Sequence, residues 1–139
     1  MDSKNAALEL GRTGEEVAAG YLKNQGYKIL ERNWRGKRGE LDMVCSLKDT
    51  IVFVEVKTRK EHSLASPHDA LTREKQARLV KAASEYLSKR KYWDRPCRFD
   101  LIAVTTPLDK KDRHSLEHVE NAFEFPEAHG RGRGAWQPW

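Results

Sequence analysis

Phe53-Val54-Glu55-Val56-Lys57-Thr58-Arg59, together with Gly39-Glu40-Leu41-Asp42-Met43-Val44 before it, decides the fold of this chain. Both stretches have the apolar, β-branched composition of strands, and Lys48-Asp49-Thr50 lies between them as a tight turn. The sequence therefore predicts an antiparallel hairpin with strands over residues 40–47 and 51–58.

The second strand of this hairpin carries charges inside an apolar run. Side chains alternate between the two faces of a strand, so Glu55 and Lys57 share one face while the neighbouring valines point to the other. A charged face in the middle of an apolar strand costs free energy unless something compensates it. We therefore expect a metal ion or a phosphate group between these charges, as metal-dependent phosphodiester cleavage requires.

Helices and further strands are expected around the hairpin. Apolar periodicity predicts helices over residues 5–25 and 72–90, the second capped by Thr72, and strands over residues 27–34, 98–105 and 116–123. The order is α-β-β-β-α-β-β, an α/β fold whose last strand lies at a sheet edge. Residues 1–126 are expected to form one domain, and residues 127–139 a flexible C-terminal tail.

Composition limits the class of protein and the partners. The chain has 139 residues and a net charge of +5, and the basic surplus lies outside residues 101–139, which hold 5 basic and 6 acidic residues. This surplus favours a polyanionic partner. No stretch approaches the length of a membrane span, about 20 apolar residues, and we expect no signal peptide, since residues 1–5 lack an apolar region. Cys45 and Cys97 lack metal-ligand spacing, so we expect buried, reduced thiols and a cytoplasmic protein.

The acids of the hairpin suit a hard divalent cation. Mg²⁺ prefers oxygen ligands and keeps several waters. Asp42 and Glu55 can supply two carboxylates if their strands pair in a suitable register, and the backbone carbonyl of Val56 could be a third ligand. Bound Mg²⁺ or Mn²⁺ lowers the pKa of a water ligand and neutralises charge at the reacting phosphate.

Three more side chains are candidates for the same site. Lys57 can orient the attacking water, or place a positive charge where negative charge develops. Glu15 interrupts the apolar face of the first helix and could reach the metal directly or through a water molecule. Gln76 continues the apolar face of the second helix by one turn, so a site role and a surface amide are comparably plausible.

Each of these signals also has an ordinary structural interpretation. Glu55 and Lys57 could form a solvated ion pair, Asp42 could cap a turn, and Asp100 is expected to make hydrogen bonds at a strand end. His114 and His118 have i,i+4 spacing without a helical pattern, so a zinc site there is not expected. Short motifs match by chance, but the coincidence of the acids and Lys57 favours one site.

The motifs together resemble a known family. They are Gly14-Glu15-x-x-Ala18, Gly39-Glu40-Leu41-Asp42, Phe53-Val54-Glu55-Val56-Lys57-Thr58-Arg59, Lys75-Gln76, Tyr86-Leu87 and Arg98-Phe99-Asp100. Over residues 6–125 the chain resembles the YraN-type family of small bacterial proteins, which is similar to archaeal Holliday junction resolvases and to the restriction-endonuclease-like superfamily.

The resemblance carries expectations for the fold and the site. It implies a restriction-endonuclease-like core, with a mixed central sheet flanked by helices, and the roles of acid, acid and Glu-x-Lys for Glu15, Asp42, Glu55 and Lys57. One feature departs from the superfamily: its nucleic-acid-processing branch often has Gln-x-x-x-Tyr, whereas Val80 stands in the tyrosine position here.

Three functions remain open from the sequence. The first is a Mg²⁺- or Mn²⁺-dependent nuclease that acts on DNA, including branched or damaged forms. The second is a non-catalytic nucleic-acid-binding module, and the third is an assembly protein with relic site residues. In the first two, the expected phosphate contacts are Arg35, Lys37, Arg38, Arg59 and Lys60. The resemblance to junction resolvases suggests a homodimer, but the sequence leaves monomer and dimer open.

Overall fold

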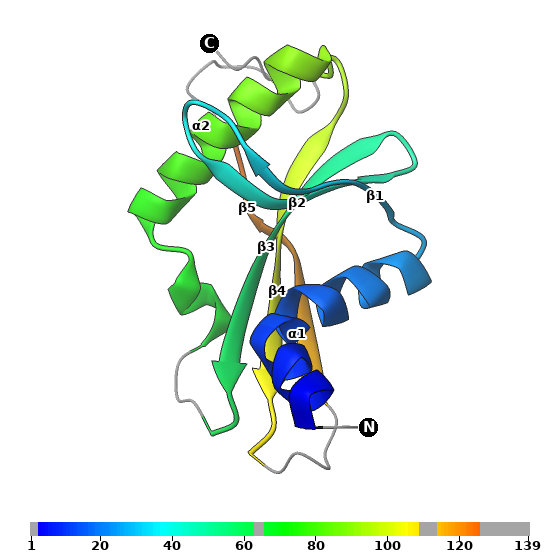
Figure 1. Cartoon of the computed structure of the whole chain (residues 1–139). Coiled ribbons are helices and arrows are strands. Elements are labelled where there is room, and N and C mark those ends of the chain that lie inside the picture. Colours follow the sequence, from blue (N-terminus) through cyan, green and yellow to red (C-terminus); the bar gives the residue numbers. More distant parts are fainter. Residues whose placement is uncertain (1–2, 63–65, 109–113, 126–139) are drawn as a thin grey trace.

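Two helices lie on opposite faces of a five-stranded sheet in the computed structural model (Figure 1). The structure describes residues 3–62, 66–108 and 114–125, and for residues 3–13 and 68 only the backbone. The elements are α1 (Ser3–Asn24), β1 (Lys28–Arg35), β2 (Glu40–Leu47), β3 (Thr50–Lys60), the short 3-10 helix η1 (Pro67–Ala70), α2 (Arg73–Arg90), β4 (Cys97–Thr106) and β5 (Ser115–Phe123).

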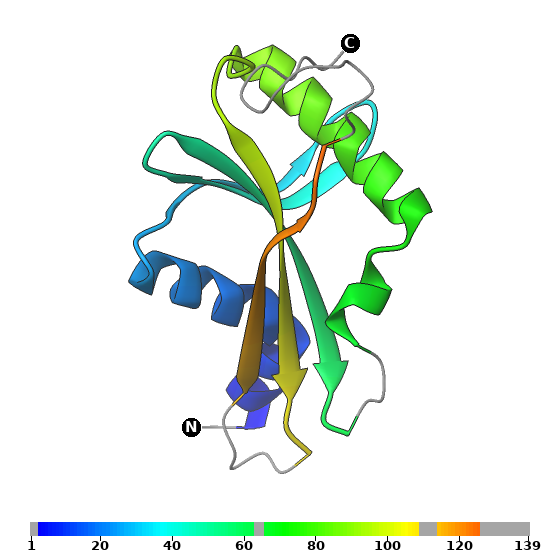
Figure 2. The ribbon, with the colours of Figure 1, turned by 180° about the vertical axis from the view of Figure 1, so that it is seen from behind.

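The predicted order α-β-β-β-α-β-β and its mixed sheet are confirmed. The strands follow the order β1-β2-β3-β4-β5, with β3 parallel to β4 and every other neighbour antiparallel. A parallel pair needs a crossover, and the chain makes it through η1 and α2 (Figure 2). The strand expected over residues 116–123 is the edge strand β5. The tail expected over residues 127–139 lies outside the described residues.

Local sequence explains where the elements end. The hairpin pairs Leu47 with Thr50, so β2 and β3 are joined by two residues. At the end of α1, Gly26 adopts φ +92°, and the Tyr27 N–H donates to the carbonyl of Leu22 at 2.9 Å, which is a Schellman cap. Helix α2 begins as predicted, because the Thr72 side chain accepts a hydrogen bond from the Lys75 N–H at 3.1 Å.

The sheet separates two apolar layers. The layer beneath α2 contains Phe53, Leu79, Tyr86 and Phe99 among others. The layer beneath α1 contains Leu22, Met43, Val52, Val54 and Ile102 among others. Alternation along β3 therefore places odd-numbered residues, and with them Glu55, on the α2 side. Helix α2 packs against its layer with Leu79, Ala82, Ala83, Tyr86 and Leu87, which are buried, while Val80 is only partly buried.

Asp100 differs from the expectation. Asp100 does make hydrogen bonds, but it lies within β4 and not at a strand end. Only 1% of its surface is exposed to solvent. Its carboxylate accepts from the Arg98 guanidinium, lies 2.7 Å from Nε2 of His118, and accepts from the Asn121 N–H. His118 also contacts the Tyr21 hydroxyl through Nδ1, at 2.9 Å. This network joins β4 and β5 to α1.

The expectation of a buried thiol is confirmed for Cys45 and only in part for Cys97. Both thiols are free, with Cys45 buried and Cys97 partly buried. Burial raises the pKa of each thiol to about 12, so both are protonated at neutral pH. Within the described ranges, neither helix is long and apolar enough to cross a membrane.

Candidate functional site

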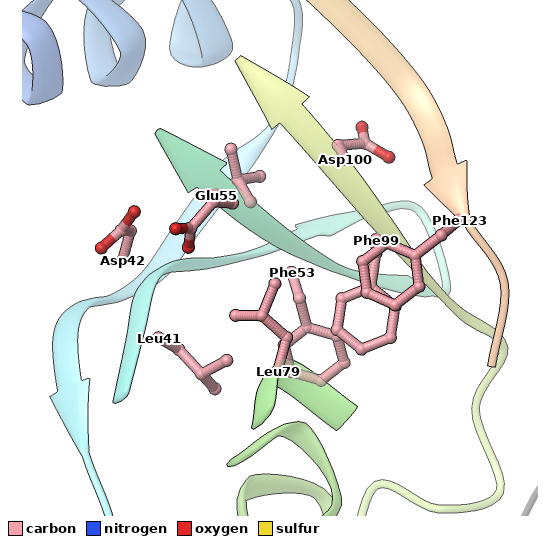
Figure 3. A pocket seen from close by; sticks show the side chains of 9 residues that line it. Leu41, Asp42, Phe53, Glu55, Leu79, Phe99, Asp100 and Phe123 are labelled. Carbon is pink, nitrogen blue, oxygen red and sulfur yellow. The ribbon is translucent and has the colours of Figure 1, made fainter. Parts of the chain in front are cut away.

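Asp42 and Glu55 meet where β2 separates from β3. The last regular pair between these strands is Met43 with Val54, and one further step of the same register places Asp42 opposite Glu55. The ladder stops there because Asp42 Oδ2 accepts the hydrogen bond of the Val56 N–H at 2.9 Å. The side chain thus satisfies a backbone donor that would otherwise lack a partner, and the two carboxyl groups lie side by side (Figure 3).

The two acids border an apolar pocket. Its lining includes Leu41, Phe53, Leu79 and Phe99. Figure 3 shows these side chains on one side of the carboxyl groups, while Asp100 lies apart and points elsewhere. Burial and the neighbouring carboxyl of Asp42 raise the pKa of Glu55 to about 7, although Lys75 opposes the shift. A site that disfavours two adjacent negative charges is one that favours an added cation.

Lys75 supplies a cation that the sequence interpretation did not assign. Its Nζ lies 3.0 Å from Oε2 of Glu55, and the two side chains are 36% and 16% exposed. Lys75 belongs to the first turn of α2, twenty residues beyond Glu55 in the chain. The pair therefore depends on how α2 crosses β3, and no spacing in the sequence indicates it.

Lys57 and Gln76 are the other two candidates close to this pair in the sequence. Lys57 is exposed on β3, two residues beyond Glu55 and on the same face by strand alternation. Gln76 is partly buried, and its amide nitrogen donates to the carbonyl of Leu71 at 2.9 Å. That bond holds the segment before α2, so Gln76 has a structural task whether or not it also contacts a substrate.

Glu15 lies on the other helix, with one carboxylate oxygen buried and without a hydrogen-bond partner. Its neighbour Gly14 packs so closely on β3 that an added Cβ would overlap the hydroxyl of Thr58. Glycine at position 14 thus lets α1 approach the strand that carries Glu55. Within the described part of the chain, no three His, Cys, Asp or Glu side chains are grouped to hold a metal ion, so Glu15 does not join Asp42 and Glu55 as a third direct ligand in this arrangement.

The residues present fit a hard divalent cation in their chemistry. Asp42 and Glu55 offer adjacent carboxylate oxygens, and Glu15 has a buried oxygen with no partner to satisfy it. Such oxygens are the ligands that Mg²⁺ and Mn²⁺ prefer, with waters completing the shell. The predicted third ligand is the backbone carbonyl of Val56. Val56 is also the residue whose N–H donates a hydrogen bond to Asp42 Oδ2.

The basic turn between β1 and β2 is held by Glu85 of α2. The backbone N–H groups of Lys37 and Arg38 donate to the Glu85 carboxylate at 2.9 and 2.8 Å. These bonds lower the pKa of Glu85 to about 2. Figure 1 shows the turn lying against α2. Glu85 thus holds the backbone of the turn, and the side chains of Lys37 and Arg38 are exposed to solvent. The basic turn is visible in the sequence, whereas its contact with Glu85 is not.

The other predicted phosphate contacts are Arg35, Arg59 and Lys60. Arg35 pairs with Glu40 on the surface at 3.5 Å. Arg59 Nε donates to the Thr105 hydroxyl at 3.4 Å, and Lys60 is exposed at the end of β3. Figure 1 places the end of β3 and the β1–β2 turn at opposite ends of the molecule. The two basic segments therefore flank the acidic pair from separate directions.

Comparison with known proteins adds the family. Residues 14–104 match the model described as "Uncharacterised protein family UPF0102". The chain belongs to this family. It is 47% identical over 139 residues, the whole chain and 99% of the relative, to a UPF0102 protein of Nitratidesulfovibrio vulgaris strain DP4. It is 45% identical to a UPF0102 protein of Lawsonia intracellularis, covering 96% of this chain and 98% of that one.

The UPF0102 match covers residues 14–104 and ends before β5. It runs from Gly14 in α1 to Val104 near the end of β4, and so includes Glu15, Asp42, Glu55, Lys75 and Gln76. It stops before β5 and therefore before His118 and Asn121, which bind Asp100. The family region thus contains the whole acidic pair and its cations, whereas the network around Asp100 is completed by residues beyond it.

Proposed function

We propose that this UPF0102 protein is a metal-dependent nuclease that hydrolyses phosphodiester bonds in DNA, including branched or damaged forms. The observation that carries the proposal is the contact between Asp42 and Glu55 at the open end of the β2–β3 ladder. The similarity to the YraN-type family and to Holliday junction resolvases supports it as an analogy of fold and motif.

The residues have separate roles in this proposal. Asp42, Glu55 and the Val56 carbonyl hold Mg²⁺ or Mn²⁺, with Glu15 acting through a water molecule. The bound cation supplies an activated water and neutralises charge at the phosphate. Lys57 orients the attacking water and stabilises the negative charge that develops. The apolar floor of Leu41, Phe53 and Leu79 excludes water from one side of the acids.

Lys57 is expected to affect rate more than binding. One ammonium among several phosphate contacts adds little affinity, but at the site it acts on charge that develops only in the reaction. Lys57→Ala should therefore reduce the single-turnover cleavage rate by about 100-fold, in the range of one lost transition-state donor, with duplex affinity nearly unchanged. Rapid-quench cleavage and fluorescence anisotropy measure the two effects. A variant that binds tenfold worse and cleaves normally would make Lys57 an ordinary phosphate contact.

The basic turn is expected to set the salt dependence of binding. Each phosphate contact contributes about 0.9 to the slope of log affinity against log salt on duplex DNA. Replacing Lys37 and Arg38 with alanine should therefore flatten the slope by about 1 to 2 and leave metal affinity unchanged. The matched control replaces exposed Lys23 and Lys28 instead, with the same change in net charge. Equal slopes for the two double variants would place the DNA path elsewhere.

A non-catalytic nucleic-acid-binding module is the second candidate. The ion pair between Lys75 and Glu55 favours it, because an ammonium already neutralises one acid. One assay separates the two functions: the purified protein is incubated with linear, single-stranded and four-way-junction DNA, each with Mg²⁺, Mn²⁺ or a chelator. Metal-dependent products support the nuclease. Binding without products supports the module, and neither binding nor products leaves the assembly protein.

A homodimer with paired sites is proposed as the form that would cut two strands symmetrically. Light scattering across a range of concentrations tests it. A monomeric mass with and without junction DNA would remove the symmetric model and leave single nicks.

A further inference from the structure

Lys75 occupies an unusual place for a lysine. It lies in the first turn of α2, where the positive end of the helix dipole disfavours cations and favours acids such as the adjacent Glu74. Its backbone N–H is already used by the Thr72 cap. A cation at position 75 therefore does not stabilise the helix. The contacts of the Lys75 side chain explain its place instead.

The side chain contacts the acidic pair. Lys75 Nζ lies 3.0 Å from Glu55 Oε2, and Figure 3 shows the Glu55 carboxyl group beside that of Asp42. Two adjacent carboxylates repel each other, and one ammonium compensates that repulsion only in part. The Glu55 side chain is mostly buried and the Lys75 side chain is partly exposed, so the cost of removing these charges from water offsets much of their attraction. The ammonium can consequently be exchanged for a stronger cation.

A divalent cation and the ammonium compete for the same place. A metal ion bound through Glu55 would lie at the carboxylate that Lys75 already contacts, and the ion and the ammonium would repel each other at such short range. From this geometry we propose that Lys75 is an exchangeable counter-ion: it stabilises the acidic pair without metal, and a divalent cation must displace it to bind. This inference rests on the proposed function, since it assumes that the acids hold a metal.

The test compares Mn²⁺ binding alone, without nucleic acid, by titration calorimetry. It is done at a pH of about 8.5, well above the ordinary pKa of carboxyl groups. Lys75→Met removes the competitor and should bind Mn²⁺ about five- to tenfold more tightly than wild type. Lys75→Arg keeps the charge and should bind as wild type does. Lys81→Met, at an exposed position of α2, makes the same change in net charge and should also leave affinity unchanged.

Thermal unfolding gives a second readout. Without metal, Lys75→Met leaves the two acids uncompensated, so it should unfold at a lower temperature than Lys81→Met. Saturating Mn²⁺ should then raise its melting temperature by more than it raises that of wild type, because tighter binding to the native state gives greater stabilisation. If Lys75→Met does not fold, Lys75→Gln is used in both measurements.

The outcomes separate this inference from the proposed function. If wild type binds Mn²⁺ and Lys75→Met binds it equally or more weakly, the competition is wrong and the metal site stands. If Lys75→Met and Lys81→Met gain affinity equally, the effect is one of net charge and the specific competition is wrong. If no protein binds Mn²⁺, the metal site is wrong, and the competition is wrong with it.

Discussion

Replacing Asp42 with asparagine is expected to abolish metal-dependent cleavage. Asparagine keeps the size of the side chain and an oxygen that can accept from the Val56 N–H, so the end of the β2–β3 ladder is retained. It removes one of the two charges that would hold the cation. Losing several kcal/mol of charge stabilisation, here about 4 kcal/mol, corresponds to a rate about a thousandfold lower. Glu55→Gln is expected to have a similar effect.

Cleavage of labelled DNA in Mn²⁺, with chelator as the background, measures this loss. Asp49→Asn serves as the matched control, because Asp49 is an exposed acid in the β2–β3 turn and lies on the same hairpin. Wild-type cleavage by Asp42→Asn would show that the acidic pair is not the metal site. A similar loss in Asp49→Asn would point to damage to the hairpin and not to the site.

Glu55→Gln should also change stability, and the sign follows from its pKa. The folded-state pKa of Glu55 is raised from 4.5 to about 7, so ionisation disfavours the folded state as pH rises through this interval. Below pH 4.5 the carboxyl is protonated in both states and that penalty is absent. Glutamine removes the penalty, and we expect Glu55→Gln to be more stable than wild type by about 2 kcal/mol at pH 8, with the gain vanishing in acid. Denaturant unfolding at both pH values checks that the inactive variant is folded.

Much of the fold could be predicted because its signals are local. Strand alternation, apolar periodicity and the Thr72 cap depend on residues close in sequence, and they predicted both α-helices and all five strands to within a few residues, but not the 3-10 helix η1. The contact between Asp42 and Glu55 could be predicted only in part. The turn expected at Lys48-Asp49-Thr50 has three residues and leaves the register open, whereas the two-residue loop of the structure pairs Leu47 with Thr50 and so sets Asp42 opposite Glu55.

The remaining features depend on contacts between distant elements. Lys75 reaches Glu55 only because α2 crosses β3, and Glu85 reaches the turn at Lys37 only because the same helix passes beneath it. Neither contact has a periodic signal. Glu15 was predictable as an interruption of an apolar face, but its distance from Asp42 depends on how α1 packs on the sheet. The contacts made by Lys75 and Glu85 thus depend on how α2 packs on the sheet, whereas the contact between Asp42 and Glu55 depends on the hairpin alone.

Asp100→Asn is expected to cause the largest loss of stability. The Asp100 side chain is 0% exposed, and it pairs with Arg98 at 2.9 Å and with His118 at 2.7 Å. Although burial opposes its ionisation, hydrogen bonds from His118 and Arg98 outweigh that effect and lower the pKa of Asp100. Removing one partner of a buried ion pair leaves an uncompensated charge and costs about 3 to 5 kcal/mol.

Thermal unfolding measures this loss, with Glu120→Gln as the control. Glu120 also contacts Arg98, at 3.2 Å, but its side chain is 63% exposed, so its loss should cost less than about 1 kcal/mol. Since the pKa of Asp100 is lowered, its contribution is present above the unfolded value of 3.8 and is lost as pH falls through the folded value. The gap between wild type and Asp100→Asn should therefore narrow in acid. Equal stability of Asp100→Asn and Glu120→Gln at neutral pH would show that the network does not hold β4 and β5 to α1.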